Sequence, residues 1–113
     1  MPEFININSV AEFENFIGSN EAVLIYFSHS ECNVCKVLKP KVQEMIEKEF
    51  DKIKIAYCDT VLFPEIAAQR SIFAVPAILV FFDGREYIRK SRNIGIDELY
   101  SLIERPYNMM FSY

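Results

Sequence analysis

Residues 22–35 read AVLIYFSHSECNVC and contain the pattern that decides the fold, a buried strand followed closely by a helix. Residues 22–28 form an apolar run of the length typical of a parallel strand covered on both faces. The helical pattern that follows starts at the CNVC motif of residues 32–35 and continues to about Phe50. The motif is therefore predicted to occupy the first turn of a helix.

This position favours chemistry at Cys32 and Cys35. The start of a helix presents unpaired N–H groups and the positive end of the helix dipole, so a thiol placed there loses its proton easily. The thiolate is the nucleophile, and CxxC cysteines in such places have pKa values of roughly 3.5–7.5. The motif predicts thiol–disulfide exchange, in which Cys32 attacks a disulfide and Cys35, one turn further in, resolves the mixed disulfide.

Three other interpretations of the cysteines remain open at this point. The pair could be inert, or it could bind zinc or an iron–sulfur centre, with Cys58, His29 or a second CxxC across a dimer completing the site. The chain could also be a non-catalytic interaction module. Cys58, the third cysteine, is most simply a small buried residue at a strand end.

Composition limits the class of protein. The chain has 113 residues, enough for one domain with its own core, and half of them are apolar. A net charge of −4 argues against a nucleic-acid surface. The first residues lack the features of a signal peptide, and no apolar stretch reaches the ~20 residues that span a bilayer. We expect a cytoplasmic protein without membrane or nucleic-acid partners, either a monomer or a weak dimer.

The remaining pattern predicts an α/β fold, a mixed sheet of about five strands in the order βαβαββα with helices on both faces. A capping box at Ser9–Glu12 opens the first helix, and Asp83-Gly84 marks a hairpin before a polar edge strand. The last helix is expected to begin at Asp97 and to stop at Pro106. The apolar tail that follows, with Met109, Met110 and Phe111, is either a strip packed on the domain, which we favour, or an association surface. The expected elements are strands 4–7, 22–28, 52–57, 77–82 and 85–90, helices from 9, 32–50, 63–70 and 97–105, the tail 106–113, and a solvated helix face of Lys36, Lys39, Lys41, Glu44, Glu47 and Lys48.

From about Phe4 to Arg105 the chain resembles the thioredoxin family. The resemblance rests on the CxxC after the second strand, on Pro40, on Val75-Pro76 before the fourth strand and on Asp83-Gly84. It implies a single thioredoxin-like domain over about 4–105, protein disulfides as substrates, a reductase as electron donor, and no organic cofactor. It also implies that Pro76 is a cis-proline facing the active site and that the backbone of Val75 pairs with an extended substrate segment.

The chain departs from the family pattern at the site itself. The usual Trp-Cys-Gly-Pro-Cys is replaced by Glu-Cys-Asn-Val-Cys at residues 31–35, and there is no tryptophan. A buried acid and its lysine neighbour are replaced by Tyr26 and Tyr57, and a glycine expected before the last helix falls near Arg92 and Asn93. A phenol is a poor base at neutral pH. The candidates for proton transfer to or from the inner thiol are therefore Tyr26, the weaker of the two, and His29, with a bound water as the alternative.

Overall fold

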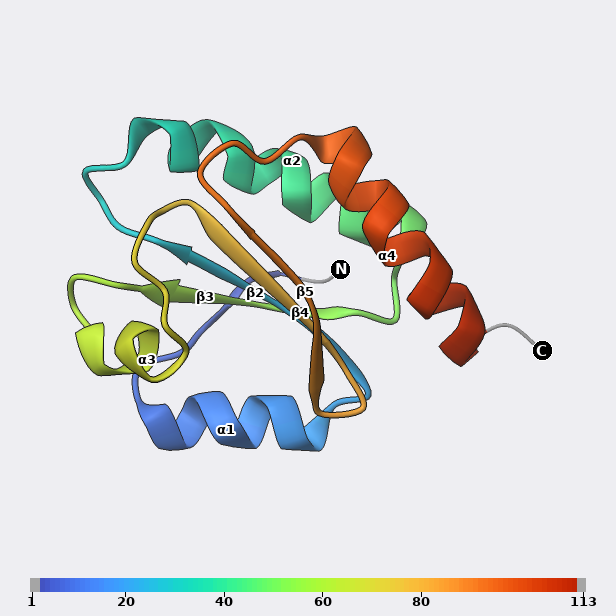
Figure 1. Cartoon of the computed structure of the whole chain (residues 1–113), viewed down its shortest axis with the longest axis horizontal. Coiled ribbons are helices and arrows are strands. Elements are labelled where there is room, and N and C mark those ends of the chain that lie inside the picture. The colour runs from blue at the N-terminus through green and yellow to red at the C-terminus, as the bar shows by residue number, and fades with distance from the viewer. Residues whose placement is uncertain (1–2, 112–113) are drawn as a thin grey trace.

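The computed structural model describes residues 3–111, which form one mixed five-stranded sheet with four helices (Figure 1). The order of elements is βαβαβαββα. Every strand and helix expected from the sequence is present. The expected order βαβαββα is one strand and one helix too short. The elements are β1 (Ile5–Asn6), α1 (Val10–Ser19), β2 (Ala22–Ser28), α2 (Asn33–Glu49), β3 (Lys54–Asp59), α3 (Pro64–Gln69), β4 (Ala77–Phe82), β5 (Arg85–Ser91) and α4 (Ile96–Phe111).

The strand that precedes the cysteines lies at the centre of the sheet. The spatial order is β1-β3-β2-β4-β5, in which β1, β3 and β2 are parallel and β4 and β5 run antiparallel to their neighbours. All seven residues of β2 are buried, as the apolar run predicted. The parallel strands β2 and β3 end at the same edge of the sheet, and β2 leads directly into the CNVC motif there.

Two hydrophobic cores lie on opposite faces of this sheet. Alternate residues of β2 point to different sides, so that Tyr26 packs in the core under α2 and α4, whereas Phe27 packs in the core over α1 and α3. Figure 1 shows the two helix pairs on the two sides of the sheet. The cysteine-bearing helix therefore rests on the face that contains Tyr26.

Local signals in the sequence account for the ends of several elements. The Ser9 side chain accepts a hydrogen bond from the Glu12 N–H (3.0 Å), and Glu12 accepts from the Asn8 N–H (2.9 Å), which caps α1 as expected. At the hairpin, Asp83 and Gly84 have φ values of 55° and 77°, which favour asparagine, aspartate or glycine. After this turn, β5 lies at the edge of the sheet, as its polar sequence indicated.

The prediction that Pro106 ends the last helix is wrong. Helix α4 begins at Ile96, one residue before Asp97, and continues through Pro106 to Phe111. The proline leaves the carbonyl of Leu102 without its helical partner, and Leu102 is 41% exposed, so water can replace that partner. Much of the expected tail is thus helix. Tyr107 is buried in the core and Met110 and Phe111 pack against it, whereas Met109 is 78% exposed; residues 112–113 lie outside the described range.

Within residues 3–111, no helix has the length and apolarity needed to cross a membrane.

Candidate functional site

The cysteine pair sits at the start of α2 with its two sulfurs in different environments. Cys32 is the N-cap residue of the helix and is half-buried, whereas Cys35 is only 1% exposed. The sulfurs are joined in a disulfide, with an S–S distance of 2.07 Å. The backbone N–H of Cys35 points at the Cys32 Sγ atom (3.2 Å). Cys32 is therefore the sulfur that solvent and a partner can reach.

This arrangement suits Cys32 to carry a negative charge in the reduced state. An N–H aimed at the sulfur and the positive end of a 17-residue helix both stabilise a thiolate. Cys35 lies in the core between α2 and the sheet, where its thiol is shielded from any large reactant. The geometry permits attack by Cys32 on an outside disulfide, followed by attack of Cys35 on Cys32.

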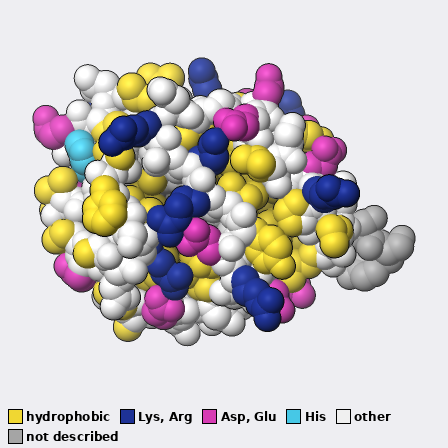
Figure 2. All heavy atoms as spheres, in the orientation of Figure 1, with side chains coloured by type: hydrophobic (Ala, Val, Ile, Leu, Met, Phe, Trp, Pro, Cys, Tyr) yellow, Lys and Arg dark blue, Asp and Glu magenta, His cyan; other side chains and the backbone are white. Residues whose placement is uncertain are grey.

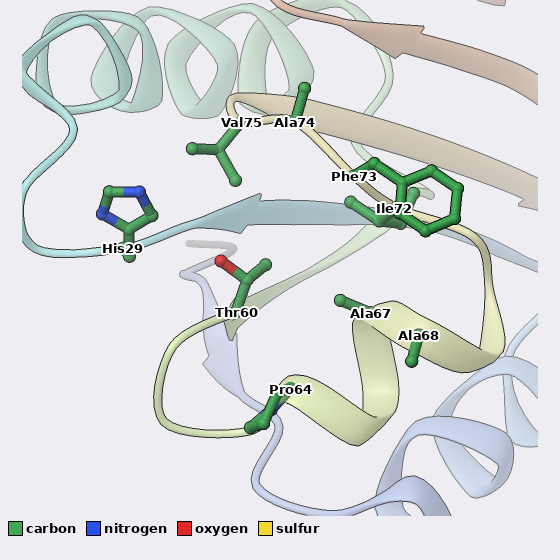
Figure 3. A pocket seen from close by; sticks show the side chains of 9 residues that line it. All are labelled: His29, Thr60, Pro64, Ala67, Ala68, Ile72, Phe73, Ala74 and Val75. Carbon is green, nitrogen blue, oxygen red and sulfur yellow. The ribbon is translucent and has the colours of Figure 1, made fainter.

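The loop that leads into β4 borders the same site. Its Val75–Pro76 peptide bond is cis, and Pro76 is buried. The next residue, Ala77, pairs with Phe27 near the end of β2, which fixes the loop beside the segment that leads to the cysteines. Val75 and His29 both line a cavity of about 310 Å³ between this loop and α3 (Figure 3).

His29 links this cavity to the cysteine motif through two hydrogen bonds. Its backbone carbonyl accepts from the Cys32 N–H (3.2 Å), and its Nδ1 atom accepts from the Glu31 N–H (3.2 Å). With Nδ1 occupied in this way, a neutral imidazole carries its proton on Nε2.

Tyr26 holds the inner end of the motif from below. It is fully buried, and its hydroxyl group donates a hydrogen bond to the backbone carbonyl of Cys35 (2.8 Å). Burial, together with the neighbouring Tyr57, raises the pKa of the Tyr26 phenol well above its usual range. The hydroxyl is thus a proton donor to the backbone at neutral pH, consistent with the expectation that it is a poor base.

Lys39 belongs to this site, although the sequence pattern predicted it on the solvated face of α2. Its Nζ atom lies 4.1 Å from the ring centroid of Tyr57 and 5.1 Å from that of Phe4. Burial lowers the pKa of this amine. The sequence does contain a signal for this placement. Lys39 is four residues after Cys35 and therefore lies on the same face of the helix. A cation from α2 therefore covers the tyrosine that stands where the resemblance places a lysine.

Cys58 lies on the other side of the sheet from the cysteine pair, in the core that contains Phe27. It is fully buried and is a free thiol. It is therefore not placed to complete a metal site with Cys32 and Cys35. Across residues 3–111, no three His, Cys, Asp or Glu side chains come together as a group that could hold a metal ion.

Large apolar side chains are exposed on the segments next to the motif. Some lie on α2 just after Cys32, some lie just after the end of β3, and one lies shortly before Pro76. Phe73, three residues before Pro76, is 88% exposed. The others are Val34, Val37, Val61 and Leu62, all more than 60% exposed.

Known proteins are similar to this chain in sequence and in fold. Residues 4–105 match the thioredoxin family. The chain is 30% identical to the thioredoxin-like protein YdfQ of Bacillus subtilis over 109 residues, which cover 96% of each chain. It is 34% identical to the thioredoxin of Chlamydia trachomatis over 97 residues, 84% of this chain and 91% of that one. The oxidised crystal structure of mitochondrial thioredoxin 3 from Saccharomyces cerevisiae superposes with a TM-score of 0.82 at 23% identity, covering 89% of this chain and 93% of that chain, which shows the fold.

Proposed function

Because the chain belongs to the thioredoxin family and carries the Cys32–Cys35 pair of a thiol–disulfide oxidoreductase, we propose that it reduces or exchanges disulfides in protein substrates. The observation that carries this proposal is the contrast between a half-buried Cys32 at a helix start and a buried Cys35. The exposed apolar side chains beside the motif support a protein as the substrate, since such surfaces are typical of protein contacts.

The reaction balances as a two-electron exchange. In the dithiol form, the Cys32 thiolate attacks one sulfur of the substrate disulfide, which breaks that bond and releases the other substrate sulfur as a thiolate. The Cys35 thiolate then attacks Cys32, forms the intramolecular disulfide and releases the second substrate thiol. Two electrons and two protons pass to the substrate. A dithiol reductant or a reductase must then return both cysteines to the thiol state.

The proposal assigns further roles around the pair. The backbone of Val75, next to Pro76, would align an extended substrate segment beside Cys32, as the family resemblance implies. The buried position of Cys35 would restrict it to intramolecular attack. A single chain would suffice for this reaction, and the cytoplasmic location expected from the sequence stays a prediction.

Cysteine substitutions test the roles. We expect Cys32→Ser to lower the rate of disulfide reduction by at least about 10³-fold, because the attacking sulfur is lost. We expect Cys35→Ser to accumulate a mixed disulfide between Cys32 and the substrate, visible by mass spectrometry after alkylation. Normal turnover of Cys35→Ser, or a substrate trapped on residue 35 in Cys32→Ser, would show that the roles are assigned wrongly.

A thiol count separates redox chemistry from metal binding. With reductant removed and a mild oxidant added, the protein should reversibly lose two titratable thiols and retain one, Cys58, in the denatured state. Elemental analysis of the purified protein is the control. Stoichiometric zinc or iron that blocks the same two thiols would contradict the redox proposal.

A further inference from the structure

Arg92 has a backbone conformation that suits glycine better. It lies just after β5 with φ at 65°, in the left-handed region that non-glycine residues adopt at an energetic cost. The family resemblance places a glycine near this point of the chain. Residues held in such a conformation are concentrated at functional sites. An arginine at this position therefore indicates a role for its side chain.

The backbone of Arg92 is attached to the loop that borders the cysteines. Its N–H donates a hydrogen bond to the carbonyl of Pro76 (2.8 Å). Val75, the residue before Pro76, lines the cavity shared with His29, whose carbonyl accepts from the Cys32 N–H (Figure 3). Arg92 is thus bonded to the loop on which a substrate segment would lie, and this loop lines the same cavity as His29, the hydrogen-bond partner of Cys32.

A second hollow of about 250 Å³ opens on the β5 side of this loop. Residues 71–74, including the exposed Phe73, line one part of it, and the end of β5 lines the other with Arg89, Lys90 and Arg92. In Figure 2, Lys and Arg side chains lie over this part of the molecule with Asp and Glu side chains among them. The hollow is thus basic on a chain whose net charge is −4.

Two of the three cations already have carboxylate partners. Arg89 contacts Glu86 (2.8 Å), and Lys90 contacts Glu98 (2.9 Å). Among residues 3–111, Arg92 has no carboxylate within ion-pair distance, and its side chain is exposed. Its guanidinium group is therefore available to an outside anion. A carboxylate matches it best, because two parallel N–H donors fit the two oxygens.

We propose that Arg92 gives the protein a preference for disulfides flanked by acidic residues. This inference rests on the proposed function and narrows its substrate class. A substrate segment along Val75 and Pro76 would bring an Asp or Glu near its cysteine to the basic hollow, where the carboxylate binds Arg92. An apolar side chain of the same segment would contact Phe73.

The test compares two disulfide-linked peptides that differ only in Glu or Gln next to the cysteine. The wild-type protein should reduce the Glu peptide with a kcat/KM about fivefold higher, the upper range for an exposed ion pair. The ratio should fall to about one in Arg92→Gln and in Arg92→Gly, stay raised in Arg92→Lys, and reverse in Arg92→Glu. Since exposed charges are screened, the wild-type ratio should also fall toward one at high salt.

Arg85→Gln is the matched control, because it removes the same charge from the opposite end of β5, where Arg85 pairs with Phe82. It should leave both rates and their ratio unchanged. Equal rates for the two peptides in the wild-type protein, or an unchanged preference in Arg92→Gln, would overturn the inference and leave the proposed function standing. If the wild-type protein reduces neither peptide and Cys35→Ser traps neither, the proposed function itself fails, and the inference fails with it.

Discussion

Tyr26 affects how the inner cysteine, Cys35, loses its proton. Its hydroxyl proton is committed to the Cys35 carbonyl, and its raised pKa keeps the phenol neutral at ordinary pH. His29 has its Nδ1 atom occupied by the Glu31 N–H. We therefore expect a water molecule, rather than Tyr26 or His29, to take the proton of the Cys35 thiol. Resolution of the mixed disulfide should be slower than in relatives that have a carboxylate at this position.

Tyr26→Asp should speed resolution by roughly 100-fold, the low end of the usual effect of a positioned base. The measurement is stopped-flow or quench-trapping kinetics of mixed-disulfide decay, with the melting temperature recorded, since a buried carboxylate costs stability. The expected gain depends on proton removal being the limiting event.

Tyr26→Phe and His29→Ala are the controls for this prediction. The first keeps the ring and removes one hydrogen bond, so it should cost about 1 kcal/mol of stability and leave the resolution rate nearly unchanged. The second should also leave that rate nearly unchanged. A tenfold slower decay in either variant would identify that side chain as the proton carrier, and no change in Tyr26→Asp would show that proton removal is not limiting.

At the scale of elements, the last turns of α4 show packing prevailing over local preference. Tyr107 lies between the rings of Phe50 (4.9 Å) and Phe111 (4.8 Å) and continues the i, i+4 series of Leu99 and Ile103. Its hydroxyl also accepts from the Lys52 N–H (3.3 Å). These contacts hold the helix together beyond its internal proline.

Tyr107→Ala should lower the free energy of unfolding by about 3 kcal/mol, the low end for loss of a buried aromatic ring. Met109→Ala, two residues further along and 78% exposed in the wild type, is the matched control and should change stability by less than about 0.5 kcal/mol. Urea unfolding of the oxidised proteins measures both. Equal losses would mean that the end of α4 is not docked through Tyr107.

The elements that the sequence predicted well were those with strong local signals. The apolar run of β2, the cysteines at the start of α2 and the Asp83-Gly84 turn all lie where their patterns indicated. What could not be predicted depends on residues distant in sequence. Pro106 is a helix breaker in isolation, and only the packing of Tyr107 on Phe50 reveals that the helix continues.

The residues of the candidate site also fall into those that a local sequence pattern predicts and those that it does not. The CxxC spacing identified Cys32 and Cys35 because that signal is local. The placement of Lys39 over Tyr57, and of Arg92 beside Pro76, follows from the crossing of α2 over the sheet and from the return of β5 to the loop. No short-range pattern contains either contact.

For the molecule as a whole, the sheet keeps the two kinds of sulfur apart. Cys35 lies in the core under α2, and Cys58 lies in the core over α1 and α3. Burial, with the nearby carboxylates of Asp59 and Glu65, raises the pKa of the Cys58 thiol to about 12. This thiol is therefore neutral and unreactive wherever the fold is intact, and it should take no part in exchange with the pair.

That separation predicts an alkaline loss of stability. The ordinary pKa of the Cys58 thiol is 9.0 and the folded value is about 12. Between these values the unfolded chain releases a proton that the folded chain keeps. The contribution is therefore complete below about pH 9 and is lost as the pH rises toward 12, at about 1.4 kcal/mol per pH unit.

Cys58→Ala isolates this effect in the oxidised protein, where Cys32 and Cys35 do not titrate. The variant should be somewhat less stable at neutral pH, because it leaves a small space in the core. Above about pH 9, however, its free energy of unfolding should fall less steeply than that of the wild type, by about 1.4 kcal/mol per pH unit. Urea unfolding at several pH values from about 8 to 11 gives both slopes, and Tyr26→Phe adds a second comparison, since Tyr26 also has a raised pKa. Parallel slopes for the wild type and Cys58→Ala would mean that the thiol titrates in the folded state, and therefore that the core over α1 and α3 admits water.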